Sequence, residues 1–72
     1  MVNGQKLRML RQACGWTPTQ LLAVLAKDHG VYVHPSSLSA YELDRVKNPP
    51  IEVLIALAKI YDVKLEDLLI DG

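Results

Sequence analysis

Glycine and proline divide this chain into short segments, and that division constrains the fold more than any other feature. Gly15 and Gly30 stand where helices commonly end, while Pro18 and Pro35 stand where they begin, and Asn48-Pro49-Pro50 interrupts the chain again. Between these points apolar residues recur every three or four positions, as on the buried face of a helix. We therefore predict one all-α domain over residues 1–72, with five short helices at about residues 4–14, 18–29, 35–45, 50–62 and 64–70.

The second of these helices has the clearest start signal. Thr17 is a suitable N-cap, Pro18 a suitable first residue, and Gln20 can complete a capping box with Thr17. Trp16 and Leu21 flank this box as a hydrophobic staple would. In the other four helices, the residues that we expect to face the core of the domain are Leu7, Leu10, Cys14, Leu38, Tyr41, Ile51, Leu54, Ile55, Ala58, Tyr61, Leu65 and Leu68.

Composition excludes several classes of protein. The chain has 72 residues, of which 50% are apolar and 22% charged, a balance that favours a folded domain over a disordered segment. Its longest apolar runs are six residues, whereas a membrane-spanning helix needs roughly 20. We see no export signal, and the single cysteine, Cys14, cannot form an internal disulfide. We therefore expect a cytoplasmic protein.

The net charge of zero conceals an asymmetry along the chain. Residues 1–48 carry six basic and three acidic side chains, a net charge of +3, and no acid precedes Asp28. Residues 49–72 carry two basic and five acidic side chains, a net charge of −3. A chain of this kind can present one basic face to a polyanion. A chance distribution of sixteen charges explains the asymmetry equally well.

The residues give little support to an enzyme or a metalloprotein. Cys14, His29 and His34 lack the Cys-x-x-Cys or His-x-x-x-His spacing of a zinc site. No glycine-rich phosphate loop is present, and a five-helix domain of this size offers no evident pocket for a catalytic triad. We expect no enzymatic activity, no metal and no cofactor.

Five motifs in a fixed order resemble the lambda-repressor-like helix-turn-helix domain of the Cro and Xre type. They are the paired Leu-Arg steps of KLRMLRQ, the Gly-Trp-Thr before the second helix, SSLSAYE, the Asn-Pro before the fourth helix, and VKLEDLL. The resemblance covers about Lys6 to Leu69. It implies a small sequence-specific regulator of transcription, a repressor, that binds double-stranded DNA with its third helix in the major groove.

The resemblance also implies roles for particular residues. The residues expected near base edges or in the groove are His34, Ser36, Ser37 and Ala40. The residues expected at phosphates are Thr17, Thr19, Gln20, Lys27, Arg45, Lys47 and Asn48. Arg11 and Glu42 occupy the places of a structural ion pair, and Ser39 is expected to face sideways. Thr17 and Gln20 also serve as caps, and His34 can cap the third helix instead of touching DNA.

Two departures from the family pattern keep a second function open. About six extra residues lie between Leu25 and Ser36, so the turn before the third helix is lengthened, and Pro18 stands where the family often has a glutamine that touches DNA. Pro35 and Ala40 cannot donate a hydrogen bond to a base. The alternative is therefore a protein-interaction module that keeps the fold but reads DNA weakly. We also expect a homodimer through the C-terminal helix, with Leu69 and Ile70 at the contact.

Overall fold

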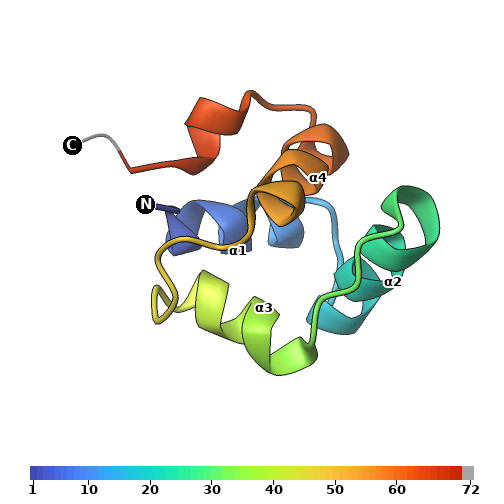
Figure 1. Ribbon diagram of the computed structural model, residues 1–72. Helices are drawn as coiled ribbons and strands as arrows, with labels where there is room; N and C mark the ends of the chain where they lie inside the picture. The colour runs from blue at the N-terminus through green and yellow to red at the C-terminus, as the bar shows by residue number, and fades with distance from the viewer. Residues whose placement is uncertain (71–72) are drawn as a thin grey trace.

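The computed structural model describes residues 1–70, which form four α-helices and one short 3-10 helix (Figure 1). The α-helices are α1 (Gly4–Ala13), α2 (Pro18–His29), α3 (Pro35–Glu42) and α4 (Ile51–Tyr61), and the 3-10 helix is η1 (Leu65–Leu68). The helix-turn-helix pair of the resemblance therefore corresponds to α2 and α3. None of the helices within residues 1–70 is long and apolar enough to cross a membrane.

The expectation of a fifth α-helix is wrong. The segment after α4 makes only a single 3-10 turn, in which the Lys64 N–H donates to Asp67 Oδ2 and the Asp67 N–H donates back to the Lys64 carbonyl. Leu69 is then extended and pairs with Val2 as an isolated antiparallel bridge. Pairing with the N-terminal residues replaces the helical hydrogen bonds that residues 64–70 were expected to make.

Three α-helices end earlier than the sequence predicts: α1 by one residue, at Ala13, and α3 and α4 because the chain turns left-handed at an aspartate. Asp44 has φ 59°, and the N–H groups of Arg45 and Val46 both return to the Ala40 carbonyl, so α3 stops at Glu42 rather than at residue 45. Asp62 has φ 53° and ends α4 at Tyr61. Asparagine and aspartate tolerate this conformation better than most residues other than glycine.

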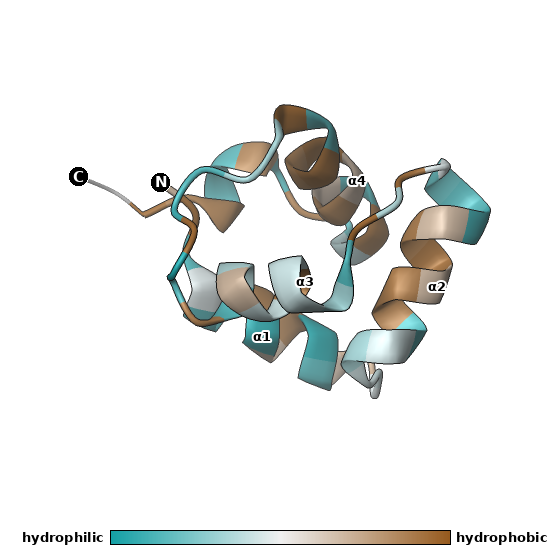
Figure 2. Cartoon of the chain, turned by 60° about the horizontal axis from the view of Figure 1, so that its bottom comes forward, coloured by the Kyte–Doolittle hydropathy of each residue, from teal (hydrophilic) through white to brown (hydrophobic). Residues whose placement is uncertain are grey.

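The core lies where α1, α2, α3 and α4 meet and is closed by η1. α3 packs against α1 and α2, while α4 packs against α2 and η1. Figure 2 shows the long apolar stretches of α2 and α4 and the hydrophilic C-terminal end of α2. The buried apolar residues are Val2, Leu7, Leu21, Leu25, Leu38, Tyr41, Val53, Leu54, Ala56, Leu57, Ala58 and Leu68.

Three expected core residues are exposed instead. Cys14 follows the end of α1 and faces solvent, and Ile51 and Ile55 are 60% and 42% exposed. Helix α4 is apolar on most of its surface, so its periodicity does not specify one face. Its packing against α2 and η1 buries the side that carries Val53 and Leu57 and leaves Ile51 and Ile55 outside.

The N-terminal residues complete the fold by binding both the α3–α4 connection and the C-terminal segment. The Val2 N–H donates to the Lys47 carbonyl (2.7 Å), and the Asn3 N–H donates to the Leu68 carbonyl (2.8 Å). The Val2 side chain is 1% exposed, although the sequence analysis gave it no role. Figure 1 shows the first residues of the chain beside the segment that follows η1 and ends at Ile70.

Candidate nucleic-acid interface

The N-terminal end of α3 is built around His34. This residue is the N-cap, and its Nδ1 accepts a hydrogen bond from the Ser36 N–H (3.1 Å) and lies 2.7 Å from the Ser36 hydroxyl. His34 and Ser36 are exposed, whereas Ser37 and Ala40 are half-buried. The structure thus places three of the expected groove residues, Ser36, Ser37 and Ala40, on α3 and the fourth, His34, at its N-cap.

The connection between α2 and α3 is anchored at two points. It consists of Gly30 to His34, begins with Gly30 in the left-handed conformation (φ 64°), and runs back beside α2 (Figure 1). Val31 and Val33 pack against the core, and the Val31 N–H donates to the Leu25 carbonyl (3.0 Å). Tyr32, between them, is 85% exposed. Because Val31 and Val33 point inward on either side of the exposed Tyr32, the lengthened connection is held against the core.

The N-terminal end of α2 carries the predicted capping box. Thr17 Oγ1 accepts from the Gln20 N–H (3.2 Å), and Gln20 Oε1 accepts from the Thr17 N–H (2.8 Å). Thr17, Thr19 and Gln20 are all exposed. Thr17 and Gln20, two of the three residues here that are expected to contact phosphates, therefore already act as caps. Their remaining polar atoms face solvent at the positive end of the helix.

The basic residues after α3 form a second exposed group. Arg45, Lys47 and Asn48 are all exposed on the segment that connects α3 to α4. This segment and the N-terminal end of α2 lie at opposite ends of α3 (Figure 1). Lys27 belongs to neither group, because it lies near the far end of α2, about 14 Å along the helix axis from Pro18.

Arg11 and Glu42 form an ion pair between α1 and α3. Arg11 Nε donates to Glu42 Oε2 (2.9 Å) and Arg11 Nη2 donates to Glu42 Oε1 (3.0 Å), and the two side chains are only 10% and 8% exposed. Arg11 Nη1 also donates to the Trp16 carbonyl (2.8 Å). The hydrogen bond to Glu42 raises the pKa of Arg11 above its usual value. One guanidinium thus joins α1, the α1–α2 turn and α3.

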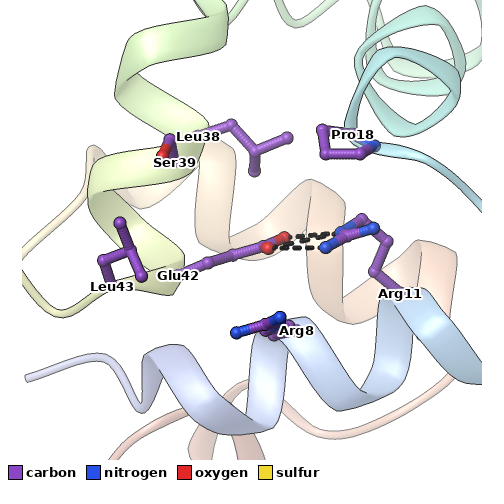
Figure 3. A pocket seen from close by; sticks show the side chains of 7 residues that line it. All are labelled: Arg8, Arg11, Pro18, Leu38, Ser39, Glu42 and Leu43. Carbon is purple, nitrogen blue, oxygen red and sulfur yellow. Dashed lines mark hydrogen bonds and ion pairs between the residues drawn. The ribbon is translucent and has the colours of Figure 1, made fainter.

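A hollow of about 250 Å³ opens beside this ion pair (Figure 3). Its lining comes from α1, the first residue of α2, and α3, and consists of Arg8, Arg11, Pro18, Leu38, Ser39, Glu42 and Leu43. Arg8 had no expected role, and Ser39 was expected to face sideways. The repeated Leu-Arg step, which puts Arg8 three residues before Arg11, is the signal that could have indicated Arg8. Among residues 1–70, no group of histidine, cysteine and acidic side chains is assembled as metal ligands would be.

Comparison with known proteins gives one match. A family model described as a helix-turn-helix domain matches residues 4–69, which is nearly the whole chain. No curated protein and no solved structure matches the sequence.

Proposed function

Because the chain belongs to the helix-turn-helix domain family, we propose that it binds double-stranded DNA as a small regulator of transcription, a repressor of the Cro and Xre type. The observation that carries the proposal is the placement of two exposed polar groups at opposite ends of α3. Together they can hold the DNA backbone on both sides of the groove that α3 enters. The proposal assigns no catalytic residue, and we expect the protein in the cytoplasm.

In the proposed complex, α3 lies in the major groove. Its N-cap His34 and the exposed Ser36 lie near base edges together with the half-buried Ser37 and Ala40, but the Ser36 hydroxyl already contacts His34. Serine can hydrogen-bond to several bases, and alanine offers only apolar contact. Sequence preference must therefore come in part from the shape and deformability of the DNA.

Phosphate contacts supply most of the affinity. Thr17, Thr19 and Gln20 approach one strand at the positive end of α2, and Arg45, Lys47 and Asn48 approach the other. Lys27, about 14 Å along the axis of α2 from Pro18, would contact a phosphate separate from the one at the start of α2.

Titration with duplex DNA at several salt concentrations tests this function. Arg45→Ala and Lys47→Ala should weaken binding to all sequences alike, and each should reduce the dependence of log K on log salt by about one. Lys59→Ala, which removes an exposed charge from α4, is the matched control and should leave binding unchanged. Ser37→Ala should alter preference among sequences with little change in salt dependence.

A protein that binds no duplex at low salt would instead fit a protein-interaction module. The feature that favours this second function is the limited hydrogen-bonding capacity of α3, where Pro35 and Ala40 donate nothing to a base. The same titration separates the two functions, because binding to DNA phosphates must weaken as salt rises.

A further inference from the structure

The hollow between α1, α2 and α3 has a residual positive charge. The Glu42 carboxylate accepts three hydrogen bonds from Arg11, and the fourth Arg11 contact goes to the Trp16 carbonyl. The charges of Arg11 and Glu42 therefore offset each other within the pair. Arg8 forms no ion pair among residues 1–70, so its guanidinium is the uncompensated charge that lines the hollow.

The polar atoms around Arg8 suit an anion. Arg8 lies three residues before Arg11 and on the same side of α1, and Figure 3 shows its guanidinium beside the Arg11–Glu42 pair. Ser39 brings an exposed hydroxyl from α3. Pro18, on the opposite wall, is the first residue of α2, so the positive end of that helix dipole faces the same space.

The walls of the hollow are partly apolar. Leu38, Leu43 and Pro18 supply apolar surface beside the charged groups, and the exposed Arg8 and Ser39 can be reached from solvent. The volume of about 250 Å³ is larger than one phosphate group needs, and the hollow opens between the helix that enters the groove and the start of α2.

We infer that this hollow is the seat of one DNA backbone phosphate, with Arg8 as its cation and the Ser39 hydroxyl as a further donor. The inference rests on the proposed binding of DNA through α3 and adds a contact from α1, which the sequence analysis left without a role in binding. Arg8 can present two parallel N–H groups to a phosphate, as lysine cannot. The ion pair of Arg11 and Glu42 forms the rigid rear wall of this seat.

The test compares two charge removals on α1 in binding to a mixed-sequence duplex of about 20 base pairs, two turns of DNA. Arg8→Gln removes the charge in the hollow. Lys6→Gln removes an exposed charge from the same helix outside the hollow. Arg8→Gln should weaken binding about tenfold at 0.1 M salt and reduce the salt slope by about 0.9, as the loss of one phosphate contact requires. Lys6→Gln should have a markedly smaller effect.

Two further variants and a direct observation sharpen the result. Arg8→Lys should retain the salt slope while losing part of the affinity, because the charge remains but the paired donors do not. Ser39→Glu should weaken binding more than Arg8→Gln, since it places a carboxylate in the seat. The Arg8 Nε–H resonance should shift when DNA is added, and thermal melting followed by circular dichroism should show that each variant is folded.

The failures of the inference and of the proposed function are distinguishable. If the unaltered protein shows no salt-dependent binding to duplex DNA, the proposed function is wrong. If the unaltered protein binds but Arg8→Gln and Lys6→Gln weaken binding equally, the phosphate does not sit in the hollow. Normal binding by Ser39→Glu would overturn the inference in the same way.

Discussion

At the scale of single residues, Arg11 has the most demanding environment in the molecule. Its charged side chain is almost completely buried and is held in place by hydrogen bonds to Glu42 on α3 and to the Trp16 carbonyl. A paired charge in such a place adds little net stability compared with a well-packed apolar residue, but an unpaired one is costly. The pair therefore specifies how α1 and α3 align.

Glu42→Gln should lower the free energy of unfolding by about 3 kcal/mol, because it leaves the buried Arg11 charge without its partner. Urea denaturation measures the change. Arg8→Ala, on the exposed part of α1, is the control and should alter stability by no more than about 0.5 kcal/mol. An unchanged unfolding midpoint for Glu42→Gln would show that the pair is open in solution.

Tyr61 presents the opposite case, a buried polar atom without a partner. Within residues 1–70 its hydroxyl makes no hydrogen bond, and burial raises the pKa of Tyr61 above the usual value of 10.0. Above about pH 10 the unfolded chain can lose this proton while the folded chain retains it. The contribution of Tyr61 to the free energy of unfolding is therefore fully present below about pH 10 and decreases as the pH rises above 10.

Tyr61→Phe should remove that alkaline loss and raise stability at pH 7 by up to about 1 kcal/mol, because it deletes an unsatisfied buried hydroxyl. Urea denaturation of both proteins between pH 7 and 11 measures the difference. Tyr32→Phe, at an exposed tyrosine, is the matched control. A clear destabilisation by Tyr61→Phe at pH 7 would mean that the hydroxyl has a partner in solution.

At the scale of elements, the close contact between the start of α1 and the end of α3 depends on Gly4. The Gly4 N–H donates to Asp44 Oδ1 (2.9 Å), so a side chain from beyond α3 caps α1. A Cβ at Gly4 would lie 2.7 Å from the Glu42 carbonyl oxygen and would also meet the Tyr41 carbonyl oxygen. Glycine is required here for space, at the point where α1 and α3 cross.

Gly4→Ala should destabilise the protein by about 2 kcal/mol, since the backbone of α3 must move to admit the methyl group. Gln5→Ala, at the next and exposed position of α1, is the control and should change stability by less than about 0.5 kcal/mol. Thermal unfolding of the two variants gives the comparison. Equal stabilities would mean that α1 and α3 separate easily at this crossing.

At the scale of the whole molecule, the first two residues lie against the last two that the structure describes, Leu69 and Ile70. The Ile70 N–H donates to the Met1 carbonyl (2.9 Å), and the two side chains are 46% and 51% exposed. Leu69, also expected at the dimer contact, is half-buried, and its backbone pairs with Val2. We propose that Ile70 and Met1 provide the apolar contact through which two copies pair, because helix-turn-helix proteins commonly occupy paired half-sites.

Sedimentation velocity should show a weak monomer–dimer equilibrium that shifts to the dimer as the protein concentration rises. Ile70→Lys should abolish it, because the change places two like charges across the symmetry axis. Ile55→Lys, on the exposed side of α4, is the control. A protein that remains a monomer at high concentration, and as one copy on a palindromic duplex, would contradict the dimer.

Across these scales, the sequence by itself determined the features that depend on neighbours within four residues. The capping box of Thr17 and Gln20 formed as predicted, as did the stop at Gly30 and the start of α3 at Pro35. These features are predictable because a cap, a turn and a helical hydrogen bond join residues close in the chain. The bounds of α1 and α2 were accordingly predicted to within one residue.

Only the tertiary structure decided which faces are buried and where distant groups meet. The hydrogen bond from Gly4 to Asp44 spans 40 residues, and the hollow beside Arg8 exists because α1, α2 and α3 converge on it. The pairing of Val2 with Leu69 likewise replaced the predicted last α-helix. A helix that is apolar on most of its surface, such as α4, fits several packings, so the elements around it determine which side is buried.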